Sequence, residues 1–139
     1  MIFLDKEEKS TINGGKNFLV SKSLIITEKP SVAQEFARIL RVSGRKDGYI
    51  ENNEYVITWC VGHLVEMVYP EEYDEKYKRW KLEDLPFLPR DYKYHVIPAV
   101  SKQYEIVHRQ LWRDDIDTVY WAGDAGKEGQ TIEENIRRF

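Results

Sequence analysis

The sequence predicts an α/β protein in which a mainly parallel central sheet is flanked by helices. Short apolar runs at 24–27, 55–60 and 118–122 are typical of buried strands, and helical periodicity lies between them at 31–40 and 101–113. Strands that alternate with helices in this way favour a parallel sheet. Such sheets bind ligands at the carboxyl ends of their strands, so the residues that follow each apolar run form the candidate site.

Composition limits the classes of protein to which the chain can belong. Its 139 residues fit one domain, and we expect a peripheral N-terminal extension at 1–21 followed by a globular domain at 22–139. The net charge of −3 gives no general basic signature, so contact with nucleic acid would need a local patch or a bridging metal ion. Cys60 is the only cysteine, which excludes a disulfide framework and favours a reducing cytoplasm. No apolar run approaches the roughly 20 residues that cross a bilayer.

The first helix is predicted by a capping signal and an apolar face. Ser31 can cap the helix, and Gln34 three residues later completes a capping-box pattern. Ala33 and Ala37 would allow the helix to pack closely on a sheet. The expected apolar face consists of Val32, Phe36, Ile39 and Leu40.

Turn signals and periodicity assign the rest of the chain. We expect a basic polar loop at 41–48 and a hairpin at 49–60. An excursion anchored by aromatic side chains follows at 69–90, and a further strand at 92–97. The Asn13-Gly14 pair could form a small hairpin within the N-terminal extension. A last helical pattern continues to Phe139, and a helix at the end of a chain suggests a fragment of a longer protein.

Two acids lie among glycines after the last strand. Asp124 and Glu128 offer carboxylate oxygens, which are the ligands that Mg²⁺ prefers. Glu128 directly follows Lys127, which excludes a Walker A loop, and the three-residue glycine spacing does not fit a dinucleotide fingerprint. Alternatively, Asp124 caps the last helix and Glu128 interacts with its N-terminal dipole. The spacing alone leaves both interpretations open.

A second acid follows the first strand. Glu28 could serve as a general acid or base there, and Lys29 could hold a phosphate. Pro30 is suited to the first position of the following helix. The alternative is a surface acid and base beside a helix cap. His63, which follows the hairpin, is by default a structural group.

Four motifs in this order resemble the type IA DNA topoisomerases, and in particular the topoisomerase III branch. They are Ile25 to Ala33, Trp59 to Glu66, Trp80 with Leu85-Pro86, and Ala122 to Gln130. The resemblance covers Leu24 to the C-terminus and corresponds to the Toprim domain, which implies a Rossmann-like Toprim fold for 22–139. It implies a parent enzyme that cleaves one DNA strand through a tyrosyl-phosphate, passes another strand and reseals the break.

The resemblance also implies roles for individual residues. Glu28 would lie beside the scissile phosphate as an acid or base with Lys29 near the same phosphate, and Asp124 and Glu128 would help to hold Mg²⁺. Further candidate contacts to DNA phosphate are Lys127, His63, Ser31 and Gln130. The implied partners are DNA, preferably single-stranded, and the remaining domains of the parent enzyme. The implied fragment is monomeric, does not enter a membrane, and lies in the cytoplasm with the nucleoid.

The sequence departs from the family pattern at two positions. The family has Asp-x-Asp-x-Glu, whereas Gly126 stands at the middle acid, so the metal ion should be held more weakly and partly by DNA phosphate. Lys127 stands where the family usually has arginine, which keeps the charge and loses the bidentate fork. Gln130 fits the topoisomerase III branch.

No tyrosine here matches the family's nucleophile, so we expect these residues alone to be unable to cleave or relax DNA. One alternative is a non-catalytic, nucleic-acid-binding accessory domain whose metal site is degraded at Gly126. Another is a different Toprim enzyme, such as a primase or nuclease, against which the motifs at 28–31 and 62–64 argue.

Overall fold

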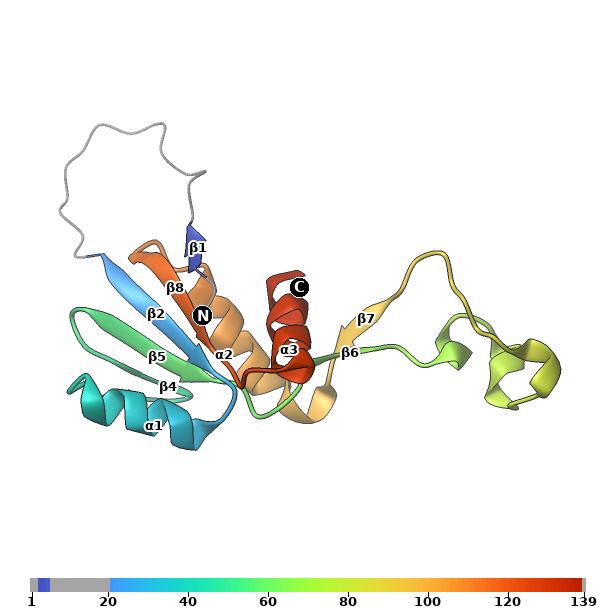
Figure 1. The fold of residues 1–139 in the computed structure, drawn as a ribbon, viewed down its shortest axis with the longest axis horizontal. Coiled ribbons are helices and arrows are strands. Elements are labelled where there is room, and N and C mark those ends of the chain that lie inside the picture. Colours follow the sequence, from blue (N-terminus) through green and yellow to red (C-terminus); the bar gives the residue numbers. More distant parts are fainter. Residues whose placement is uncertain (1–2, 6–20, 139) are drawn as a thin grey trace, which may run out of the picture.

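A computed structural model describes residues 3–5 and 21–138 and shows a six-stranded sheet in the order β1-β8-β2-β5-β4-β3 (Figure 1). The central strands β8, β2 and β5 are parallel, and the remaining strands add to them in antiparallel fashion. The strands are β1 (Phe3–Asp5), β2 (Lys22–Thr27), β3 (Gly44–Lys46), β4 (Tyr49–Glu51), β5 (Tyr55–Trp59) and β8 (Ile116–Ala122). The predicted α/β fold and the predicted hairpin are therefore confirmed.

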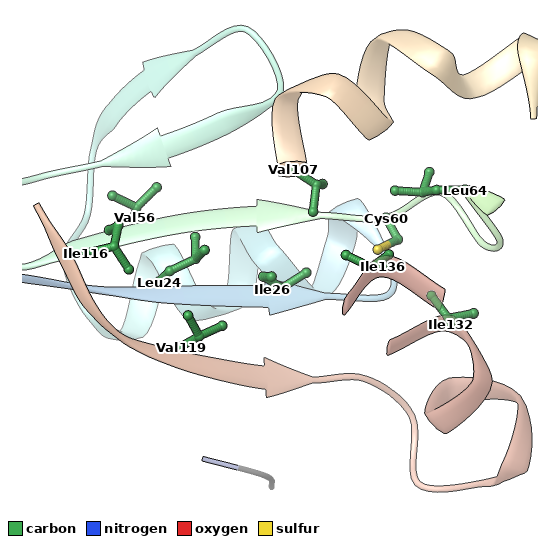
Figure 2. Close-up of a cluster of buried hydrophobic side chains, with 10 residues drawn as sticks. All are labelled: Leu24, Ile26, Val56, Cys60, Leu64, Val107, Ile116, Val119, Ile132 and Ile136. Atoms are coloured by element: carbon green, nitrogen blue, oxygen red, sulfur yellow. The ribbon is translucent and has the colours of Figure 1, made fainter. Parts of the chain in front are cut away.

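Alternate residues of β2 enter two separate cores because successive side chains of a strand point to opposite faces. Ile25 packs with residues of α1 (Pro30–Ile39) on one face of the sheet. Leu24 and Ile26 pack on the other face, where α2 (Ser101–Leu111) contributes Val107 and α3 (Lys127–Arg138) contributes further side chains (Figure 2). The sheet is thus covered by helices on both faces, as the sequence predicts.

The start of α1 differs from the capping-box prediction. Lys29 occupies the N-cap position with no side-chain cap hydrogen bond, and Ser31 lies inside the first turn. Pro30 takes the first helical position, where its fixed φ is already suitable, so the helix begins two residues earlier than Ser31 capping requires.

The predicted face of α1 is confirmed in part, since Phe36 and Leu40 pack against the core on this side of the sheet. Ala33 and Ala37 are the buried residues, and their small side chains bring the helix close to the sheet. Ile39 is 62% exposed because it lies about 200° around the helix from Ala37, at about 100° per residue.

The structure departs from the predictions at both edges of the sheet. The expected loop at 41–48 contains the charged edge strand β3, which pairs with β4, so the loop assignment is wrong there. The strand is too short and too polar for its alternation to be recognised in the sequence. At the other edge, β1 pairs with β8, so part of the expected extension joins the sheet. The boundary at residue 21 otherwise stays a prediction, and the Asn13-Gly14 hairpin lies outside the described residues.

An arm, defined here as residues 65–96, projects away from the sheet (Figure 1). Its base is an antiparallel ribbon of β6 (Val65–Met67) and β7 (Tyr94–Val96). Its outer part holds three short 3-10 helices, η1 (Pro70–Glu72), η2 (Glu75–Lys78) and η3 (Leu82–Asp84). Tyr73 and Tyr77 contact the Phe87 ring edge-on at centroid distances of 5.1 and 5.0 Å, which confirms the predicted aromatic anchoring. A fourth such turn, η4 (Pro98–Val100), leads into α2. No helix among the described residues is long and apolar enough to cross a membrane.

Candidate active site

The two acidic motifs meet at one edge of the sheet because β2 and β8 are adjacent parallel strands. Thr27 at the end of β2 pairs with Ala122 at the end of β8, so the residues that follow each strand emerge side by side. Glu28 and Lys29 leave β2 at this edge, and Asp124 leaves β8. The tertiary structure therefore brings together residues that are nearly a hundred positions apart.

Direct contacts join the two motifs. The Lys29 ammonium donates a hydrogen bond to Asp124 Oδ2 at 2.8 Å. The Asp124 backbone N–H donates to Glu28 Oε2 at 3.3 Å. His63 Nε2 lies 3.6 Å from Glu128 Oε1, which brings the segment after β5 to the same site.

The carboxylates of the site attract the Lys29 ammonium. Its hydrogen bond to Asp124 and the charge of Asp124 raise its pKa above the usual range, and the charges of Glu28 and Glu128 raise it further. All three acids therefore lie close enough to attract the ammonium. Since the side chains of Lys29 and Asp124 are 55% and 61% exposed, water screens these attractions.

Glycines shape the loop that carries Asp124. A Cβ at Gly129, in the first turn of α3, would lie 2.3 Å from the Asp124 carbonyl oxygen, so the close approach requires glycine. A Cβ at Gly126 would meet no atom within 4 Å. The middle position of the acidic motif therefore has open space for a side chain. Across the site, Gly62 has a φ of 89°, a left-handed conformation that favours glycine and turns the chain into His63.

The alternative of helix capping receives mixed support. Glu128 lies in the first turn of α3, where the helix dipole favours an acid. Gly126, however, directly precedes the helix, and the Asp124 carboxylate contacts Lys29 instead. Asp124 is thus held toward β2, on the side of the other acids.

The donor set suits a hard cation that keeps much of its water. Mg²⁺ is commonly held by one or two carboxylates together with substrate phosphate and water. Asp124 and Glu128 supply such carboxylates on an exposed edge. Within residues 3–5 and 21–138, no three His, Cys, Asp or Glu side chains converge tightly enough to enclose a metal ion. The fit is therefore to a cation shared with a phosphate, and not to a closed protein cage.

The remaining predicted contacts occupy the same edge or the helices beside it. Ser31 is exposed in the first turn of α1, and Lys127 is exposed at the start of α3. Gln130 is exposed as well, and its amide donates to Glu134 Oε1 at 3.2 Å along the helix. The Gln130 amide must therefore break its hydrogen bond to Glu134 before it can donate to a phosphate.

Sequence reasoning missed two residues that support the site. The Thr27 hydroxyl donates to the Lys29 carbonyl at 2.9 Å and so holds the backbone after β2. Cys60 is buried, and its backbone N–H donates to the Thr27 carbonyl. Burial, assisted by the charge of Glu28, raises the pKa of the Cys60 thiol to about 12. The only available signal was their position at strand ends next to the motifs.

Comparisons with known proteins identify the family of this chain. The family model described as the Toprim domain matches residues 23–139. DNA topoisomerase 3 from Bacillus cereus (strain ATCC 10987) is 48% identical over 113 residues, which cover 81% of this chain and 16% of that protein. DNA topoisomerase 3 from Staphylococcus haemolyticus is 47% identical and that from Staphylococcus aureus (strain USA300) is 44% identical, each over 80% of this chain. The chain spans only 16% of the length of these relatives.

Proposed function

Because the chain belongs to the Toprim domain family, we propose that it serves as the Toprim domain of a type IA, topoisomerase III-like DNA topoisomerase. Toprim domains bind divalent metal ions, and we take the ion here to be Mg²⁺. The observation that carries the proposal is the pair of contacts from Lys29 and Glu28 to Asp124, which unite both acidic motifs at one strand edge. In the parent enzyme this edge would face the scissile phosphate of a single DNA strand.

Each side chain has a role that its chemistry supports. Asp124 and Glu128 would hold Mg²⁺, which neutralises phosphate charge when bound. Glu28, half-buried beside the Asp124 backbone, would move a proton at the scissile phosphate. Lys29 would hold a phosphate oxygen, and Lys127, His63, Ser31 and Gln130 would position the backbone of the strand.

A metal titration of the 139-residue chain tests this proposal. We expect Mg²⁺ or Mn²⁺ at low-millimolar concentration to shift the amide NMR signals of Glu28, Asp124, Gly126 and Glu128 in a saturable manner. In Asp124→Asn the affinity should fall about tenfold or more, because the variant loses an anionic ligand. Unchanged spectra in the wild-type chain would contradict the proposal.

The chain alone should not act on DNA topology. The proposed cleavage needs a nucleophilic tyrosine that would lie in the remaining domains of the parent enzyme. We therefore expect the pure chain to leave supercoiled plasmid unrelaxed in the presence of Mg²⁺. Metal-dependent relaxation by this chain, free of contaminating enzyme, would overturn that expectation. Monomeric behaviour and action at the nucleoid belong to the same proposal.

The second candidate function is a non-catalytic accessory domain with a degraded metal site, which Gly126 favours. The open space at Gly126 provides a discriminating variant, because a Cβ there would meet no atom within 4 Å. Gly126→Asp should tighten Mn²⁺ binding of a working site about tenfold, whereas the isosteric, neutral Gly126→Asn should leave it nearly unchanged. If only Gly126→Asp binds Mn²⁺ and the wild-type chain does not, the accessory function is the better conclusion.

A further inference from the structure

A cation of the chain itself contacts one ligand of the proposed metal site. The Lys29 ammonium contacts Asp124 Oδ2 at 2.8 Å, and this oxygen belongs to a carboxylate that would bind the divalent ion. The charges of Glu28 and Glu128 also act on the Lys29 ammonium. Lys29 therefore neutralises part of the negative charge that would attract a metal ion.

Hydrogen bonds hold the backbone of Lys29, whereas its side chain is largely exposed. Its carbonyl accepts hydrogen bonds from the Thr27 hydroxyl at 2.9 Å and the Ala33 backbone N–H at 3.2 Å. The side chain is 55% exposed and carries its charge on a flexible four-carbon stem. Exposed ion pairs are weak, so the ammonium can exchange Asp124 for another anion at little cost.

A divalent cation and the ammonium repel each other when they share one carboxylate. We infer that Lys29 is an internal competitor of the divalent cation at Asp124, and that metal binding releases its ammonium to hold a DNA phosphate. This inference rests on the proposed metal site and adds a coupling to it. By linkage, metal binding strengthens phosphate binding by some factor, and a phosphate that draws Lys29 away from Asp124 strengthens metal binding by that same factor.

The test measures Mn²⁺ affinity by calorimetry on the whole 139-residue chain at low ionic strength. Lys29→Met keeps most of the stem and removes the charge, so the variant should bind Mn²⁺ roughly three- to tenfold more tightly than wild type. Lys78→Met is the matched control, since Lys78 forms a similar exposed pair with Glu75 at 2.7 Å on the arm. Its Mn²⁺ affinity should stay within about twofold of wild type.

A second readout follows the lysine itself and the predicted coupling. Saturating Mg²⁺ should shift the side-chain NMR signals of Lys29 and leave those of Lys78 in place. A short single-stranded oligonucleotide should raise the Mn²⁺ affinity of the wild-type chain by a larger factor than that of Lys29→Met, because a phosphate that shares the cation acts in both chains and release of Lys29 acts only in the first. An equal gain in both chains would refute the part of Lys29. Equal Mn²⁺ affinity of the wild-type chain with and without the oligonucleotide would overturn the coupling to phosphate.

The outcomes separate this inference from the proposed function. If the wild-type chain binds Mn²⁺ and Lys29→Met binds it equally or more weakly, competition by Lys29 is refuted while the metal site stands. If neither chain binds Mn²⁺, both the metal site and the competition are refuted. Circular dichroism of each variant checks that the fold is kept.

Discussion

Replacing Gly129 with alanine should displace Asp124 and weaken metal binding without touching any proposed ligand. The new Cβ would lie 2.3 Å from the Asp124 carbonyl oxygen, and ordinary contact begins near 3.4 Å. The carbonyl must therefore withdraw by about 1 Å, and the obstructing atom is backbone, which cannot rotate away as a side chain would.

The expected magnitude combines two opposing effects. Overpacking a filled site costs about 1–3 kcal/mol, and the better helix propensity of alanine offsets up to about 1 kcal/mol of this cost. We expect a net loss of about 1–2 kcal/mol in the free energy of unfolding, measured by urea denaturation. Because Asp124 moves with its carbonyl, Mn²⁺ affinity should fall about tenfold.

Gly126→Ala provides the control within the same loop. Its Cβ meets no atom within 4 Å, so neither steric displacement nor movement of Asp124 is expected. Its unfolding free energy should change by no more than about 0.5 kcal/mol, and its Mn²⁺ affinity by less than about twofold. Equal effects of the two alanine substitutions, or an unchanged metal affinity in Gly129→Ala, would refute the reasoning from close approach.

Two further predictions concern stability and reactivity. Arg113 Nη1 lies 3.0 Å from Glu51 and Nη2 lies 2.7 Å from Asp115. Its hydrogen bond lowers the pKa of Asp115; partial burial would raise that of Glu51, but hydrogen bonds from Arg113 and Lys22 lower it. Arg113→Met should cost about 1–2 kcal/mol near neutral pH. A carboxyl group whose pKa is lowered by folding stabilises the folded state at pH values above its ordinary pKa, which is 4.5 for Glu51 and 3.8 for Asp115. The cost of Arg113→Met, measured by urea denaturation, should therefore shrink as the pH falls below these values. A constant cost down to strongly acidic pH would contradict this assignment. Separately, the buried thiol of Cys60, whose pKa is raised to about 12, should react with a thiol reagent only in urea, and rapid reaction of the native chain would contradict its burial.

Local pattern was sufficient for much of the fold. The apolar runs that became β2, β5 and β8 and the periodicity of α2 follow from side-chain chemistry along the chain, which a sequence displays directly. Edge strands were different. The strand β3 has only three residues, two of which are charged, and it is too short to show alternation, so only its pairing with β4 identifies it as a strand.

Candidate site residues could be named from sequence, but their partners could not. An acid after a buried strand and acids among glycines indicated Glu28, Asp124 and Glu128 from residue type and position alone. Which groups meet was decided by the parallel pairing of β2 with β8, whose register no local signal specifies. That pairing brings the Asp124 carboxylate to 2.8 Å from the Lys29 ammonium. Lys29, which was expected to bind a phosphate, therefore contacts a residue that was expected to bind the metal ion.

Competition between local signals was likewise settled only in three dimensions. Ser31 and Gln34 form a valid capping pattern in sequence, yet Pro30 starts α1 two residues earlier than that pattern requires and leaves Ser31 in the first turn. The sequence by itself determined which residue types stand near the strand ends and therefore which chemistry is available. The tertiary structure decided how those residues pair, because contacts across the sheet depend on strand order and register, which are properties of the whole chain and not of any one segment.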